Sequence, residues 1–117
     1  MAAPNLIGAT TITGKTAVAN VTTSSTSFLN NPSSSGKVYK VNLLMVSNVH
    51  GTNSGDISVE LYRSATSYNI AKTIAVPADA TLDLLNKSIY LEEGDDLKCL
   101  ASANSTLNLV CSYEEIS

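Results

Sequence analysis

Short segments in which apolar and polar residues alternate are the feature that most constrains how this chain can fold. In residues 56–63, for example, Ile57, Val59 and Leu61 alternate with Ser58 and Glu60. A period of two places successive side chains on opposite faces of a β-strand. Clusters of Gly, Pro, Asn and Ser separate these segments, and the clearest of them spans residues 30–36. This pattern is typical of an antiparallel sandwich or barrel.

The alternation predicts about eight short strands. They are expected at residues 16–22, 37–49, 56–63, 68–76, 88–91, 96–102 and 106–113, with an apolar pair at 28–29 and a loop or short strand within 78–87. Because no strand–helix–strand unit is present, we expect an all-β, jelly-roll-like antiparallel β-sandwich. The length of 117 residues suits one domain, which we place at residues 15–117. Residues 1–14 are polar and weakly patterned and are expected to form an N-terminal arm or an edge strand.

The longest predicted strand, at residues 37–49, is apolar on both faces in its middle. One face is expected to hold Tyr39, Val41, Leu43, Met45 and Val49. Leu44 and Val46 would then lie on the opposite face, where they would contact a partner. Together with the amphipathic tyrosines and two apolar residues of the arm, they make up the predicted interface: Leu6, Ile7, Leu44, Val46, Tyr62, Tyr68 and Tyr90.

The chain is poor in charge. Charged residues make up 15 % of it, against about 25 % in ordinary soluble domains. A surface with few charges tolerates packing against other subunits, so a homo-oligomer such as a trimer is expected. The net charge is −3 and the basic residues are scattered, which argues against nucleic-acid binding. We also expect no membrane span, no signal peptide and synthesis in a cytoplasm.

Motifs that would support catalysis or cofactor binding are incomplete. Gly14-Lys15-Thr16 follows Gly8 at the wrong spacing for a phosphate-binding loop, and the segment after it alternates like a strand. His50 lies in a polar turn with no nucleophile beside it. We therefore expect a protein that is not an enzyme and has no catalytic, cofactor-binding or metal-binding residues.

Two further clusters have ordinary structural interpretations. Cys99 and Cys111 are expected to be buried free thiols, with a cross-strand disulfide as the alternative. The acidic stretch of Glu92, Glu93, Asp95 and Asp96 is expected to be a solvated turn. A Ca²⁺ site is the alternative there, since carboxylates are hard oxygen ligands.

Several strings of residues link this sequence to a known group of proteins. They are Val76-Pro77-Ala78-Asp79-Ala80-Thr81-Leu82, Ile89-Tyr90-Leu91-Glu92-Glu93-Gly94-Asp95-Asp96-Leu97, Ala101-Ser102-Ala103-Asn104, the ending Ser112-Tyr113-Glu114-Glu115-Ile116-Ser117, and the opening Ile12-Thr13-Gly14-Lys15-Thr16. Over most of its length the chain resembles small virion structural proteins of marine tailed phages, especially cyanophage-type myoviruses.

The resemblance implies a virion protein that is made in the host cytoplasm and assembles with other particle proteins. The function that we expect is a capsid decoration or cement protein, bound to the major capsid protein. A neck, collar or tail component is the alternative within the same class. An alternative of another class is a carbohydrate-binding adhesion module that uses the three tyrosines and the turn at Asp95 and Asp96.

Overall fold

The computed structural model describes residues 6–103 and 106–117. Within these ranges the chain forms a short 3-10 helix and nine β-strands. They are η1 (Leu6–Gly8), β1 (Ile12–Asn20), β2 (Thr26–Asn30), β3 (Val38–Asn48), β4 (Gly55–Arg63), β5 (Thr66–Val76), β6 (Thr81–Asp83), β7 (Ile89–Leu91), β8 (Asp96–Ala101) and β9 (Leu107–Ile116). The predicted all-β fold is confirmed.

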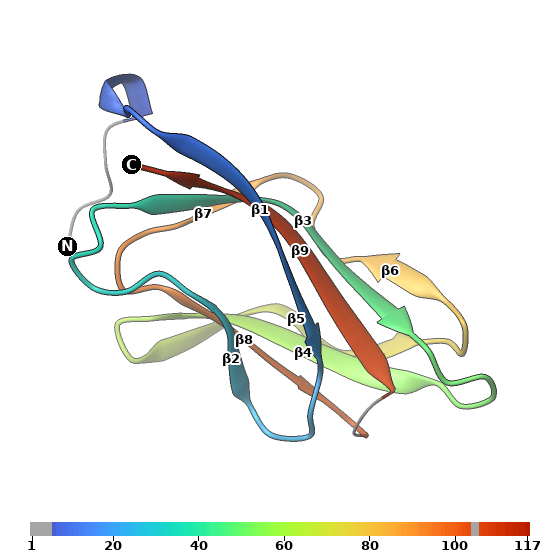
Figure 1. Cartoon of the computed structure of the whole chain (residues 1–117). Helices are drawn as coiled ribbons and strands as arrows, with labels where there is room; N and C mark the ends of the chain where they lie inside the picture. The colour runs from blue at the N-terminus through green and yellow to red at the C-terminus, as the bar shows by residue number, and fades with distance from the viewer. Residues whose placement is uncertain (1–5, 104–105) are drawn as a thin grey trace.

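The strands make two antiparallel sheets that pack face to face (Figure 1). The first sheet has the order β1-β9-β3, with β6 and β7 both paired to the far edge of β3. The second sheet has the order β2-β8-β4-β5. Inward-facing Val, Leu, Ile and Cys side chains of both sheets fill the space between them, as the alternating pattern requires.

The order in which the chain visits the two sheets is that of a jelly roll. It moves from β1 in the first sheet to β2 in the second and returns to β3, then repeats this crossing through the later strands. β6 and β7 occupy one strand position, because β6 pairs with residues 45–47 of β3 and β7 with residues 39–41. The nine strands thus fill eight positions. The prediction of about eight strands had left the segment that holds β6, residues 78–87, as a loop or short strand.

One predicted face assignment is wrong, and a β-bulge is the reason. The register of β3 against β9 shifts between Val41 and Leu43, so the alternation changes phase at Asn42. Leu44 and Val46 consequently point into the core and are 0 % exposed. They cannot form the predicted interface. Leu43 and Met45, which were expected on the face of Val41, point outward instead and are half-buried.

The N-terminal part of the chain joins the first sheet earlier than residue 15. β1 begins at Ile12 and is an edge strand of that sheet, so it includes the last three residues of the predicted segment 1–14. Thr10 and Thr11 both donate backbone hydrogen bonds to the carbonyl of Ser117. The helix η1 therefore lies beyond the end of the sandwich, close to the C-terminus (Figure 1).

Candidate interaction surface

The outer face of the first sheet carries a block of nine residues without a formal charge. Strand register aligns them in three cross-strand rows, each with one residue from β1, β9 and β3. The rows are Thr16–Ser112–Leu43, Val18–Val110–Met45 and Asn20–Asn108–Ser47. We call these nine residues the neutral face. They come from segments that are about 25 to 100 residues apart in the sequence.

The neutral face is apolar along its centre and accessible to solvent. Val18 is 71 % exposed, and Val110 and Met45 beside it are half-buried. An open hollow of about 410 Å³ lies where β1 and β9 meet, and its lining includes Val18, Asn20, Asn108 and Val110. Interface centres in general are depleted of charge, so this surface is suited to contact with another protein.

Charged and aromatic residues border the neutral face. At one end Glu114 of β9 lies opposite Lys40 of β3, and Tyr90 of β7 continues the same row. Beside the central row, Asp83 of β6 pairs with Met45. The surface thus combines an uncharged centre with a charged rim, as subunit interfaces commonly do.

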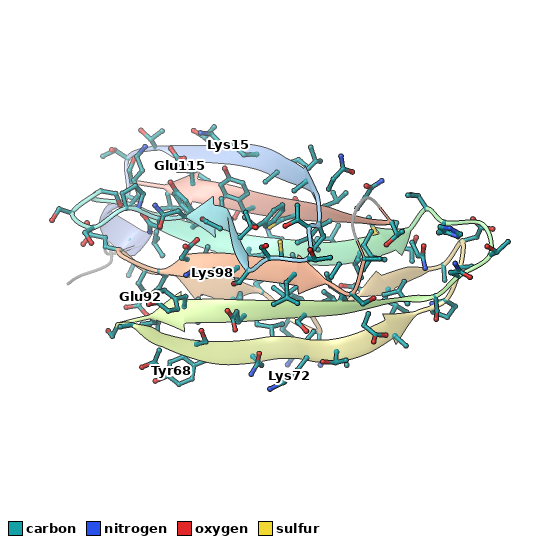
Figure 2. The ribbon with its side chains drawn as sticks, turned by 90° about the horizontal axis from the view of Figure 1, so that it is seen from below. Lys15, Tyr68, Lys72, Glu92, Lys98 and Glu115 are labelled. Carbon is teal, nitrogen blue, oxygen red and sulfur yellow. The ribbon has the colours of Figure 1, made fainter. Side chains whose placement is uncertain are left out.

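The three predicted interface tyrosines do not form one surface. Tyr90 is 41 % exposed and lies beside the neutral face on the first sheet. Tyr62 lies on the second sheet, where the ammonium group of Lys98 is 3.8 Å from its ring centroid. Tyr68 is 57 % exposed and protrudes from β5 at the far edge of the second sheet (Figure 2). Tyr90 is thus on a different sheet from Tyr62 and Tyr68, and the three side chains share no single surface.

The two apolar residues predicted from the N-terminal segment belong to η1. Ile7 is 96 % exposed, so its side chain is accessible at the end of the sandwich. The side chain of Leu6 lies outside the described part of the structure. Neither residue is part of the neutral face.

The acidic stretch after β7 is not the fully solvated turn that was predicted, because Glu93 and Asp95 are buried while Glu92 and Asp96 are half-buried. Asp95 is 2 % exposed, and Glu93 is 8 % exposed. Asp95 accepts hydrogen bonds from Nε and Nη2 of Arg63 and from the backbone N–H of Glu92. These bonds compensate the cost of burying the carboxylate, and the bond to Asp95 raises the pKa of Arg63.

The same turn binds the loop between β2 and β3. Asn31 donates its backbone N–H to the carbonyl of Asp95, and Gly94 donates its N–H to the carbonyl of Asn31. The Gly36 N–H donates to the Glu93 carboxylate. Gly94 has a φ of +87°, a conformation that glycine adopts without strain. The acidic residues therefore stabilise one end of the sandwich.

A second charged cluster attaches β1 to β9. Glu115 accepts hydrogen bonds from Nζ of Lys37 at 2.8 Å and from Nζ of Lys15 at 3.0 Å, and Figure 2 shows Lys15 beside Glu115. Hydrogen bonds first from Lys37 and then from Lys15 lower the pKa of Glu115 below its ordinary value. The Gly14-Lys15-Thr16 sequence lies inside strand β1.

His50 and the cysteines have structural roles. His50 Nδ1 accepts the backbone N–H groups of Thr52 and Asn53, which closes the turn between β3 and β4. Cys99 and Cys111 are buried free thiols, as predicted, and burial raises the pKa of each to about 11.

Among the described residues, no group of three or more His, Cys, Asp or Glu side chains could hold a metal ion. No helix in that part of the chain is long and apolar enough to cross a membrane.

Comparison with known proteins found a similar solved structure but no matching protein family. No protein-family model matches the sequence, and no curated protein matches it either. A solved structure from Bacillus endospore appendages, reported as a novel family of disulfide-linked pili, superposes with a TM-score of 0.55. It shares 13 % sequence identity, and the match covers 98 % of this chain and 95 % of the pilus chain. At this identity the similarity shows a common fold and nothing more specific.

Sequence reasoning missed the residues at the centre of the neutral face. Val18 lies on the same side of β1 as the polar residues Thr16 and Asn20, so the alternation in residues 16–22 does not mark that side as apolar. Met45 was assigned to the core because the bulge at Asn42 leaves no mark in the local alternation. The one signal in the sequence was an apolar residue, Val18, on a strand side that is otherwise polar.

Proposed function

We propose that this chain is a non-enzymatic structural subunit of a phage particle. Its role would be that of a capsid decoration or cement protein, attached to the major capsid protein as a small homo-oligomer such as a trimer. Its location would be the virion, after synthesis in the host cytoplasm. The observation that supports a contact role is the neutral face, with Val18 71 % exposed at its centre. The phage assignment rests on the sequence resemblance given above.

The rest of the molecule is consistent with a structural role. The charged clusters around Asp95 and Glu115 join strands and loops to one another. Every buried side-chain nitrogen or oxygen in the described residues has a hydrogen-bond partner. Polar groups that are fully engaged in the fold stabilise a rigid module, and a rigid module is what a particle lattice repeats. Many copies would then sum weak contacts into strong attachment.

A neck, collar or tail subunit is the second candidate. The common fold with a pilus subunit supports it, because a jelly roll of this size can be the repeating unit of a fibre. Copy number separates the two candidates. A decoration protein is present in a simple ratio to the major capsid protein, whereas a ring at the neck or tail contains far fewer copies.

Quantitative mass spectrometry of purified virions is the test. We expect a copy number comparable with that of the major capsid protein. A number far below it would replace decoration with the neck or tail candidate. Absence from virions would contradict both.

A matched pair of variants tests the contact surface itself. Val110 lies on the middle strand β9 of the neutral face, and Leu100 occupies the corresponding outward position on β8 of the second sheet. Both are half-buried. Val110→Asp should lower occupancy on the particle at least about tenfold, whereas Leu100→Asp should leave it unchanged. Equal effects of the two variants would contradict attachment through the neutral face.

A further inference from the structure

The free edges of the two sheets differ in how well they could bind another strand. β2 has five residues and a register shift between Ser27 and Leu29. β5 is interrupted by two register shifts against β4, and Thr73 within it has a φ of +51°. β6 and β7 have three residues each. Short length and bulges are the features by which proteins protect sheet edges from pairing.

β1 lacks these features. Among the edge strands of the described residues, it alone combines nine residues with an unbroken register, from Ile12 opposite Ile116 to Asn20 opposite Asn108. Its single formal charge is on Lys15, whose ammonium group is already bound to Glu115. Its side chains include Ile12 at 63 % and Val18 at 71 % exposure. A long, regular and apolar edge strand is a ready template for a further strand.

The backbone groups on this free edge can be identified. Thr11 and Ser117 exchange both of their backbone hydrogen bonds, and Val21 donates its N–H to Leu107. In an antiparallel ladder, hydrogen-bonded and non-hydrogen-bonded pairs alternate. The N–H and C=O groups that point away from β9 are therefore those of Ile12, Gly14, Thr16, Val18 and Asn20.

We propose that this edge binds β1 of a second copy of the chain. The two β1 strands would run antiparallel about a two-fold axis at Thr16, so that the first sheet continues from one chain into the other. Thr16 pairs with Thr16, Gly14 with Val18, and Ile12 with Asn20. All five outward-facing residues of each strand then form backbone hydrogen bonds across the axis.

Charge and space favour this register. An axis at Lys15 would place two ammonium groups directly opposite each other, which is destabilising, whereas the axis at Thr16 places Lys15 opposite Ala17. Gly14 has no atom within 4 Å of the position a Cβ would occupy. The side chain of the partner's Val18 can therefore approach Gly14 on the outer face. The charge at Lys15 and the space at Gly14 therefore both allow a second β1 strand to pair in this register.

This pairing goes beyond the proposed function, because it requires only a second copy and no particle. It predicts a dimer, which differs from the trimer that a decoration protein could form. Sedimentation velocity or light scattering of the purified full chain gives the mass. We expect twice the 12.2 kDa of one chain. A monomer at every concentration up to about 1 mM, a trimer or an open-ended polymer would overturn the pairing, whatever the virion copy number.

Proline at the axis tests the backbone contact. The N–H of Thr16 points away from β9, so Thr16→Pro removes a donor from the free edge and none from the β1–β9 ladder. We expect a folded monomer with an unchanged circular dichroism spectrum. Thr16→Val keeps the N–H and should remain a dimer. A Thr16→Pro variant that is folded and still dimeric would overturn the proposal.

Cysteine cross-linking tests the register and does not depend on whether the proline variant folds. Two residues at the axis have Cα atoms about 5.5 Å apart, within the range of a disulfide. Thr16→Cys should therefore form a covalent dimer under mild oxidation. Residues at position 18 of the two chains would be about 13 Å apart along the strands, so Val18→Cys should not. Cross-linking of Val18→Cys as fast as that of Thr16→Cys, or of neither variant, would overturn this arrangement.

Discussion

Arg63 donates hydrogen bonds from Nε and Nη2 to the two carboxylate oxygens of Asp95, a side chain that is 2 % exposed. Arg63 ends β4 and Asp95 immediately precedes β8, so this bidentate pair joins two neighbouring strands of the second sheet. Asp95 also accepts the N–H of Glu92. We therefore expect the acidic turn to contribute to the free energy of unfolding.

Replacing Asp95 should destabilise the protein markedly. Asp95→Ala leaves the N–H of Glu92 without its acceptor and Arg63 without its buried partner. We expect the free energy of unfolding to fall by about 2–3 kcal/mol, as measured by urea denaturation. Glu92→Gln is the matched control, because Glu92 binds the same guanidinium but its side chain is 46 % exposed. Its cost should be below about 1 kcal/mol, and equal costs would contradict this account of the turn.

The bulge at Asn42 predicts opposite behaviour for two adjacent residues. Leu44 is 0 % exposed, so Leu44→Ala should lower the free energy of unfolding by about 2–5 kcal/mol. Met45 is half-buried on the neutral face, and Met45→Ala should cost about 1 kcal/mol or less. Thermal or urea unfolding measures both. If Met45→Ala lowered the free energy of unfolding more than Leu44→Ala does, the side chains of β3 would not change face at Asn42.

Acid should weaken the attachment of β1 through Glu115. Its pKa in the folded protein lies below the ordinary value of 4.5. The stabilisation is therefore complete above that value and is lost as the pH falls through the lower folded-state pKa. Unfolding measured between pH 3 and 6 should show a smaller loss of stability on acidification in Glu115→Gln than in the wild type. A Glu115→Gln variant that loses stability as steeply on acidification as the wild type would contradict this account.

The two thiols should be inert until the protein unfolds. Burial raises the pKa of Cys99 and Cys111 to about 11, and the thiolate is the reactive form. At pH 8 a colorimetric thiol reagent should modify them at least about a hundredfold more slowly than an added Ser67→Cys on the exposed part of β5. In denaturant, without reductant, both should react at once. If no thiol reacts there, a disulfide joins the two residues.

Much of the fold could be predicted because its signals are local. Alternation within residues 56–63 and 106–113 predicts strands β4 and β9, and the residues expected to be buried there include Ile57 and Cys111. Turn clusters located the connections. The candidate surface could not be predicted in the same way, because Leu44 and Val46 were assigned to it from an uninterrupted alternation that the bulge breaks.

The sequence by itself thus determined the all-β class, the positions of most strands and the low charge of the surface. These properties depend only on composition and on residues that are neighbours in the sequence, so they do not require knowledge of the tertiary structure. Tertiary structure decided the rest. The row of Val18, Val110 and Met45, the burial of Asp95 beside Arg63 and the free edge of β1 all depend on strand register between distant segments. Register follows from packing of the whole sandwich, and for that reason no local pattern could reveal these sites.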